Sequence, residues 1–324
     1  MQAADTSMPE NILNRPDAQT DDRQRRSWRT SPSRKVRRQT LLGWLFVLPA
    51  LATYSLFVLL PLALTVQYSL YRWDGFNVPE WVGLSNYRTV LTDPDLLNTI
   101  FNAFRLIFFF SFIPVILGLV VASVIRRSST GSLGNIARTV LFLPQVIPLV
   151  AAGIVWSVVL SLSGLANQIL TTVGLEGITR AWLGDFDTAL PAVGLIGTWV
   201  LLGLCTLLLL TGMTKIDPAL YESARLDGAG AFREFLAITL PSLRQEIAVC
   251  VTVTVIAALR SFDIVYVTTG GGPGLATMVP GLDIYVLAFQ ARAVGVASAL
   301  AVVLILLIVI IILPIQWLGR GNGE

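Results

Sequence analysis

Charged and aromatic residues gather near the end of one apolar stretch. Arg260 and Asp263 lie three positions apart, so a helix would place them on one face, where they could form an ion pair. Rings that stack and polar groups that hydrogen-bond, in this stretch and in others, could also bind a ligand. The candidate rings are Trp156, Trp199, Phe262 and Tyr266. The candidate polar groups are Gln145, Asn167 and Asp263. A structural ion pair is the alternative for the two charged residues, and packing or interface anchoring is the commoner role of aromatic residues in membrane helices, so these interpretations stay open.

A second pattern lies in the connection between two apolar stretches, residues 213–245. Such a connection needs only a few residues, so its length indicates structure of its own. Asp217 followed by Pro218 predicts a helix start, with the aspartate as N-cap and the proline in the first turn. Gly228 can turn the chain after that helix, and residues 231–238 can form a second short helix. The connection is therefore predicted to be a helix-turn-helix on the membrane surface.

The sequence lacks residues that several kinds of catalytic site require. Its only lysines are Lys35 and Lys215, and neither belongs to a GxxxxGK[ST] loop, which binds nucleotide phosphates. It has no histidine, and its two cysteines, Cys205 and Cys250, lie within apolar stretches. We therefore expect no catalytic residue, no metal site and no ATP site of that type in this chain.

The composition is that of a membrane protein. Of the 324 residues, 54% are hydrophobic and 13% are charged, and the mean hydropathy is +0.72. Soluble domains have about 45–50% apolar and about 25% charged residues. A helix needs about 20 apolar residues to cross the hydrocarbon core. Six stretches meet that length: 42–69, 101–125, 137–162, 189–212, 246–269 and 295–318. The predicted fold is all-α, a polytopic membrane protein with about six transmembrane helices.

Arginine and lysine are unevenly distributed between the two sides of these spans. Residues 1–39 are polar and rich in arginine, and we expect a disordered cytoplasmic tail followed by a transmembrane domain over residues 40–320. Most other basic residues lie in the second and fourth connections and at the carboxyl end. Because short cytoplasmic loops carry the excess of basic residues, both termini are predicted to be cytoplasmic in a multi-pass plasma-membrane protein. The modest net charge of +3 gives no reason to expect a nucleic-acid partner.

The connection at 213–245 resembles the EAA loop of ABC importer permeases. That loop has Glu-Ala-Ala, a glycine six positions after the glutamate, and Ile-x-Leu-Pro about ten positions further on. The matching residues are Glu222, Ala224, Asp227, Gly228, Ala229, Ile238, Leu240 and Pro241, with Ser223 where the family usually has alanine. The resemblance implies a coupling helix that docks into a cleft of an ATPase subunit. The residues expected to make this contact are Glu222, Ser223, Ala224, Asp227, Gly228, Ala229 and Phe232.

Residues 261–289 are similar to the carbohydrate branch of these permeases, in particular to the first permease subunit of maltose-type transporters. The similarity begins at Ser261-Phe262-Asp263 and includes Gly270–Pro273, Ile284-Tyr285 and Ala288-Phe289; overall it covers about residues 41–318. It implies a sugar or oligosaccharide as cargo. The candidates for the substrate path are then Arg260, Phe262, Asp263, Tyr266, Trp156 and Trp199. The glycines at 270–272 either end a helix in a plain turn or contact a binding protein.

The resemblance implies a type I ABC importer permease fold and several partners. They are a second homologous permease subunit, two ATP-binding cassette ATPase subunits, an extracytoplasmic substrate-binding protein and membrane lipid. This chain would form half of the pathway in a heterodimer that works by alternating access. It would bind no cofactor, since ATP and Mg would be used by the partner ATPase, and it would not itself be an enzyme.

Two other classes of function remain at this point. A stand-alone secondary transporter would transport without ATPase partners, and a membrane scaffold would not transport at all; the EAA-like spacing argues against both. Within the importer interpretation, glycerol phosphates, polyamines or amino acids are alternative cargoes, because substrate choice rests largely on the binding protein.

Overall fold

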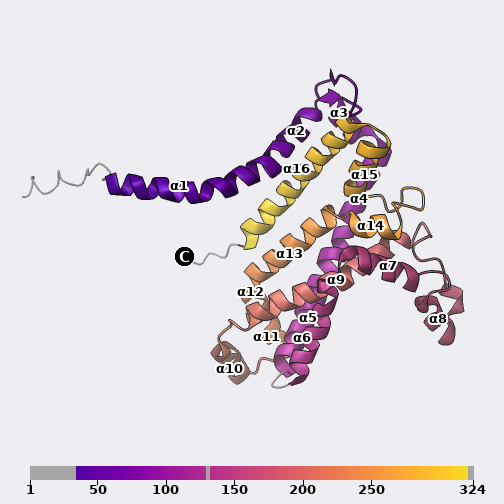
Figure 1. The fold of residues 1–324 in the computed structure, drawn as a ribbon. Helices are drawn as coiled ribbons and strands as arrows, with labels where there is room; N and C mark the ends of the chain where they lie inside the picture. Colours follow the sequence, from indigo (N-terminus) through magenta and orange to yellow (C-terminus); the bar gives the residue numbers. More distant parts are fainter. Residues whose placement is uncertain (1–33, 129–131, 320–324) are drawn as a thin grey trace, which may run out of the picture. The chain divides into compact units, whose positions relative to one another are not determined.

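The computed structural model describes residues 34–128 and 132–319 (Figure 1), and the chain divides into two compact units, Met1–Pro61 and Leu62–Glu324. The described part of the first unit is helical, with α1 (Arg34–Tyr54) followed by the π-helical turn η1 (Ser55–Leu59). Most of the predicted tail, residues 1–33, lies outside the described residues. The helix α1 already includes the last residues of that predicted tail.

The second unit contains long apolar helices and several short elements. Its first elements are the end of α2 (Leu60–Tyr68), the hairpin strands β1 (Tyr71–Arg72) and β2 (Glu80–Trp81), α3 (Ser85–Thr92), α4 (Pro94–Ile107), η2 (Phe108–Phe112), α5 (Ile113–Ser128) and α6 (Ser132–Val146). Then follow α7 (Leu149–Val159), α8 (Leu165–Thr172), η3 (Glu176–Ile178), α9 (Ala189–Met213), α10 (Pro218–Leu226), α11 (Ala231–Glu234), η4 (Phe235–Thr239) and α12 (Leu240–Ser242). The last are α13 (Arg244–Leu259), α14 (Asp263–Thr268), α15 (Pro280–Tyr285), η5 (Val286–Gln290) and α16 (Val294–Gly319).

Four helical stretches of the described chain are long and apolar enough to cross a membrane: Trp44–Tyr68, Pro94–Arg126, Ala189–Met213 and Val294–Gly319. Two bent helix pairs bring the number to six if each pair is one span. The all-α, polytopic membrane fold predicted from the sequence is therefore confirmed.

The third predicted span, residues 137–162, is not a straight helix. The segments Thr139–Val146 and Leu149–Val159 meet at an angle of 103°. Pro148 directly precedes α7. At the end of α6, the amide of Ile147 donates a hydrogen bond to the carbonyl of Pro144, three residues earlier. Proline lacks the N–H that would continue the helical ladder, so the chain bends here.

The fifth predicted span, residues 246–269, is also wrong in its extent. The helix α13 ends at Leu259, and α14 begins at Asp263 after a break whose last residue, Phe262, has φ −139° and ψ −63°. Arg260 and Asp263 therefore do not share a helical face. Neither residue takes part in an ion pair among the described residues, so the predicted Arg260–Asp263 pair is not formed.

Small residues let the long helices of the second unit approach closely. A Cβ on Gly203 of α9 would lie 2.0 Å from the carbonyl oxygen of Leu141 on α6, and one on Gly197 would lie 2.0 Å from the ring of Phe110. The hydroxyl of Thr254 on α13 donates to Ser111 over 2.7 Å. Close contact at small residues and hydroxyl bonds between helices are typical of packing within a membrane.

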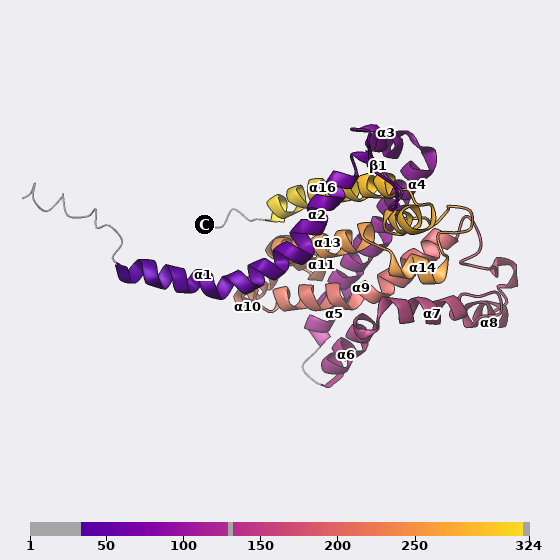
Figure 2. The same cartoon turned by 45° about the horizontal axis from the view of Figure 1, so that its top comes forward.

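Figures 1 and 2 both show α10 at one end of α13 and α14 at the other. The chain order agrees, because α10, α11 and α12 precede α13 and α14 follows it. This helix has 16 residues, which corresponds to about 24 Å of length at about 1.5 Å per residue. The helix α13 thus connects the 213–245 connection to the region around Phe262 and Tyr266, the two regions that the sequence analysis selected.

Candidate functional site

The connection at 213–245 forms the predicted helix-turn-helix. The Asp217 carboxylate accepts the Ala219 amide at 3.0 Å, and Pro218 occupies the first turn, so α10 starts as predicted. At its end, the amide of Gly228 donates to the carbonyl of Arg225, and the amide of Ala229 donates to that of Ala224. These two bonds define a Schellman motif, whose turning residue must adopt positive φ; Gly228 does so at +76°.

The second helix of this connection is longer than predicted. After α11, the chain continues through the π-helical turn η4 and α12, so Pro241 lies inside helical structure and does not end it. The π-helical turn η4 directly before Pro241 already interrupts the regular α-helical hydrogen bonding, so a residue without an N–H is accommodated there. The stretch Ala231–Ser242 then meets α13 at 71°.

The predicted coupling residues are mostly exposed. Glu222, Ser223, Asp227 and Gly228 are exposed, and Ala224 and Ala229 are half-buried. Two large apolar side chains accompany them: Phe232 is 75% exposed, and Leu226, which sequence reasoning did not select, is 90% exposed. An exposed surface that mixes apolar and charged side chains is suited to docking on another protein.

Contacts among the described residues hold α10 against the rest of the second unit. The Arg225 Nε donates to the Glu234 Oε1 at 2.9 Å. The hydroxyls of Tyr221 and Thr239 hydrogen-bond at 2.9 Å. The guanidinium carbon of Arg126, at the end of α5, lies 4.1 Å from the centre of the Tyr221 ring. These contacts therefore fix the position of α10, with its exposed surface, relative to α5, α11 and η4.

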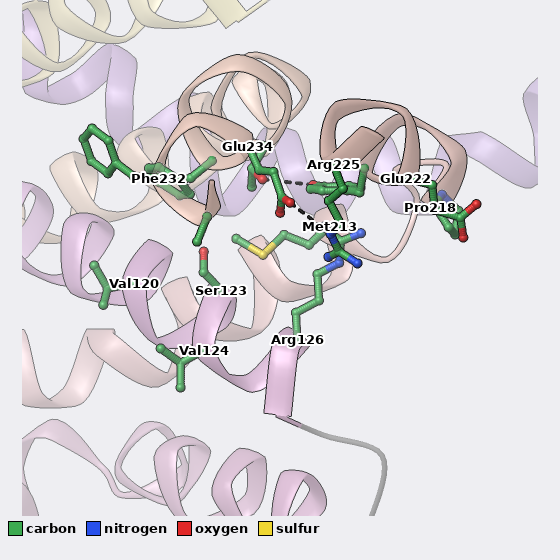
Figure 3. Close-up of a pocket in the computed structure, with 14 residues that line it drawn as sticks. Val120, Ser123, Val124, Arg126, Met213, Pro218, Glu222, Arg225, Phe232 and Glu234 are labelled. Carbon is green, nitrogen blue, oxygen red and sulfur yellow. Dashed lines mark hydrogen bonds and ion pairs between the residues drawn. The ribbon is translucent and has the colours of Figure 1, made fainter. Parts of the chain in front are cut away.

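A cavity of about 680 Å³ lies between α5, α9 and the α10–α11 region (Figure 3). Its lining residues are Val120, Ser123, Val124, Arg126, Met213, Pro218, Tyr221, Glu222, Arg225, Ala231, Phe232, Glu234, Phe235 and Thr239. Nothing in the sequence pattern pointed to Arg126 or Glu234 as partners of α10, because they lie on separate elements.

At the other end of α13, four aromatic rings form a continuous cluster. The rings of Phe262 and Tyr266 stack with centroids 5.4 Å apart and planes 11° from parallel. Tyr285 lies edge-on to both, at 5.7 Å and 6.0 Å, and Phe289 follows at 5.4 Å from Tyr285. Tyr266 is 49% and Phe289 75% exposed. The candidate rings Phe262 and Tyr266 are thus brought together, with two rings not selected as site residues.

The other aromatic candidates form a separate pair. The rings of Trp156 on α7 and Trp199 on α9 are 5.6 Å apart and edge-on. Trp156 and Phe262 both pack against one buried cluster that includes Ile264 and Val265. These tryptophans therefore support the packing beside the aromatic cluster and are half-buried themselves.

The polar candidates take different roles. Arg260 and Asp263 are exposed next to the aromatic cluster. Asn167 is only 4% exposed and has structural partners: its amide donates to the carbonyl of Arg180 at 2.8 Å, and its oxygen accepts the indole N–H of Trp182 at 2.8 Å. The Gln145 Oε1 is buried with no hydrogen-bond partner among the described residues.

The glycine-rich segment after α14 is a tight turn. Gly270 and Gly271 have φ of +60° and +91°, values that favour glycine. The buried Asn102 on α4 anchors the chain beyond this turn, since its amide donates to the carbonyl of Met278 at 3.0 Å. The predicted helix-ending turn is therefore present, and its contact with a binding protein stays a prediction.

One buried carboxyl lies outside the candidate spans. Asp283 on α15 is 8% exposed. Burial is the largest cause that raises its pKa, to about 6; a hydrogen bond from Thr99 lowers the pKa, and the charges of Asp93 and Asp95 raise it further. Among the described residues, no group of three or more histidine, cysteine, aspartate or glutamate side chains could hold a metal ion.

Comparison with protein families matches residues 114–321 to the binding-protein-dependent transport system inner membrane component. The chain is 35% identical over 268 residues to the probable ABC transporter permease protein YurN of Bacillus subtilis, covering 82% of this chain and 91% of that protein. It is 36% identical over 261 residues to the trehalose/maltose transport system permease protein MalF of Thermococcus litoralis, covering 80% and 85%. It is 32% identical over 265 residues to the lactose transport system permease protein LacF of Rhizobium radiobacter, covering 81% and 88%.

A solved structure shares the fold. A chain of a bacterial ABC transporter involved in the import of the acidic polysaccharide alginate superposes with a TM-score of 0.75 at 23% identity, covering 90% of this chain and 98% of that one. With the family match spanning well over half of the chain, the expectations of a membrane-embedded transport protein with this fold are confirmed. The chain belongs to the binding-protein-dependent transport system inner membrane components and is a permease subunit of an ABC importer.

Proposed function

We propose that this subunit imports a sugar or oligosaccharide and forms half of the translocation pathway with a second homologous permease subunit. Two ATPase subunits bind below it and use ATP and Mg, while an extracytoplasmic binding protein delivers the cargo. The chain itself catalyses no reaction. Both termini lie in the cytoplasm, on the same side as α10. Supporting this orientation, the basic residues Lys215, Arg225 and Arg233 accompany the α10–α11 region.

The observation that carries the coupling role is the exposed surface of α10 and α11. Its exposed side chains include Glu222, Leu226 and Phe232. The contacts that hold this surface in place are made by Arg126, Tyr221, Arg225, Glu234 and Thr239. A docking helix must be exposed to its partner and rigid toward its own subunit, so that a push on it moves the helices behind it. The helix α13 then carries that movement to the aromatic cluster.

A sugar is the cargo class that this cluster fits. Aromatic faces stack on the apolar faces of sugar rings, and Tyr266 and Asp263 offer polar groups beside exposed rings. The names of relatives that transport trehalose, maltose and lactose support the same class. A stand-alone secondary transporter would need neither the coupling surface nor an ATPase.

Uptake and ATPase measurements on the reconstituted importer test this proposal. Phe232→Ala should lower both cargo uptake and cargo-stimulated ATP hydrolysis while the chain stays in the membrane. Phe101→Ala removes another exposed aromatic, on a candidate span, and should leave both rates near those of the unsubstituted importer. Transport that persists after removal of the ATPase subunits, driven by an ion gradient, would refute the proposal.

The class of cargo is tested by substitutions of Tyr266 in the aromatic cluster. Tyr266→Phe keeps the stacked ring and Tyr266→Ala removes it. If the ring stacks on a sugar, Tyr266→Ala should lower uptake strongly and Tyr266→Phe only slightly. Equal uptake by both variants, or stimulation of the ATPase only by non-sugar cargo on its binding protein, would exclude a sugar.

A further inference from the structure

The cavity beside α10 extends across the point where a membrane-crossing helix ends. Val120 and Val124 on α5 line it and are 53% and 56% exposed. Arg126 also lines it and is the last residue of the candidate span Pro94–Arg126. From Val120 to Arg126 the helix rises about 9 Å. Basic residues at the end of an apolar span are expected at the level of lipid headgroups, so the groove is expected to run from that level toward the hydrocarbon core.

Two guanidinium groups lie at the polar end of this groove. Arg126 sits over the ring of Tyr221, and Arg225 is one helical turn from Tyr221 on the same face of α10. Figure 3 shows the two guanidinium groups pointing toward one another. Like charges that point toward one another repel, and a nearby anion offsets this repulsion.

The acidic side chains of the groove neutralise only part of this charge. Glu234, which is 5% exposed, is paired with the Nε of Arg225. Glu222, the other acid in the lining, is drawn away from the two guanidinium groups in Figure 3. The Arg225 side chain is 64% exposed, so the rest of its guanidinium can reach a further anion. Among the described residues of the lining, two arginines therefore face Glu234 as the one acid on their side of the groove.

We propose that an anionic phospholipid of the leaflet in which α5 ends binds in this groove. Its phosphate lies between Arg126 and Arg225, and an acyl chain runs along Val120 and Val124 toward the hydrocarbon core. The groove offers both things that such a lipid requires, paired arginines at headgroup level and an apolar wall that continues into the membrane. Because Arg126 lies in the last turn of α5 and Arg225 lies on α10, the lipid connects the coupling surface to a membrane helix.

The test uses the full chain with its co-purifying subunits in nanodiscs of phosphatidylcholine with a minor share of phosphatidylglycerol. Native mass spectrometry then measures the phosphatidylglycerol that stays bound. Arg126→Gln should lower this occupancy about fivefold, the effect of one arginine near an anionic headgroup. Val124→Trp keeps both charges and should lower it by filling the groove. Neither variant removes the Arg225–Glu234 ion pair.

The matched control is Arg233→Gln, which removes an exposed arginine of the same short region that does not line the groove. It should retain the lipid fully. Three outcomes would overturn the proposal: unchanged occupancy in Arg126→Gln, equal retention of phosphatidylcholine, or displacement of the lipid by inorganic phosphate alone. The lipid measurement does not depend on the cargo. Failure of this proposal can therefore be distinguished from failure of the proposed function, which is measured by cargo uptake.

Discussion

The Arg225 Nε and the Glu234 Oε1 are 2.9 Å apart and join α10 to α11 across the Gly228 turn. The two side chains differ in exposure, at 64% for Arg225 and 6% for Glu234. A buried carboxylate that loses a cationic partner is destabilised more than an exposed guanidinium that loses its acid. The pair therefore restrains the turn that carries the coupling surface.

This asymmetry predicts the effect of single substitutions. Arg225→Ala should lower the free energy of unfolding by about 2 kcal/mol, and Glu234→Ala by about 1 kcal/mol. Thermal unfolding of the detergent-solubilised chain measures both, and the double variant completes a cycle with a coupling energy of about 1 kcal/mol. Purely additive effects would show that the ion pair does not stabilise the turn.

The positive φ of Gly228 gives a second prediction, about the stability of the turn and about uptake. A Cβ at this position would meet no atom within 4 Å, but φ is +76°. Gly228→Ala should therefore cost about 1 kcal/mol of turn stability and lower uptake, and Gly228→Asn should cost less, because asparagine tolerates positive φ better. Gly228→Asp, which also adds a charge to the docking surface, should abolish uptake while the chain remains in the membrane.

Gly230 supplies the matched control for these variants. It lies two residues further on, also has no atom within 4 Å of a Cβ, and has φ −75°. Gly230→Ala should leave uptake close to that of the unsubstituted protein. Normal uptake in Gly228→Asp would exclude a coupling role for this turn.

The sequence predicted what depends on composition and on local pattern. Apolar length predicted a polytopic helical protein, and Asp217, Pro218 and Gly228 predicted a capped, turning helix that the structure confirms. Contacts between distant segments could not be predicted. Arg225 on α10, for example, is bound by Glu234 from the next helix, nine positions further along the chain.

The breaks in two spans were missed for a related reason. Apolar length does not show where a helix bends, so it predicts one continuous helix for residues 137–162 and one for residues 246–269. Pro148 was a visible signal of the first bend. The break at Arg260–Phe262 carries no proline or glycine, and tertiary packing accompanies it: Phe262 lies beside Tyr266 and Tyr285, and a Cβ on Gly281 would lie 2.8 Å from the Ser261 carbonyl oxygen. Assembly of the aromatic cluster is thus a tertiary property.

Close helix packing gives a third prediction. Because a Cβ on Gly203 would lie 2.0 Å from the carbonyl oxygen of Leu141, Gly203→Ala should force α6 and α9 apart and cost about 1–3 kcal/mol. Thermal unfolding in detergent measures this change. Gly177→Ala, at a position with no atom within 4 Å, should leave the unfolding temperature nearly unchanged. Equal unfolding temperatures for both variants would show that the helices do not pack this closely.

Asp283 gives a prediction about pH. Burial raises its pKa to about 6 from an ordinary value of 3.8, so between these values the folded state keeps a proton that the unfolded state has released. Stability contributed by this group should therefore be greatest at acidic pH and fall as pH rises to about 6. Asp283→Asn carries no charge to desolvate and should be more stable than the unsubstituted protein at pH 7 by up to about 3 kcal/mol.

Thermal unfolding in detergent between about pH 4 and pH 8 separates this effect from a general change of charge. The advantage of Asp283→Asn should grow through the window in which the Asp283 carboxyl ionises and stay constant above it. Asp187→Asn removes a carboxylate from an exposed position and should give no such trend. If Asp283→Asn were less stable than the unsubstituted protein at neutral pH, the carboxylate would be stabilised in the folded state by partners that outweigh its burial.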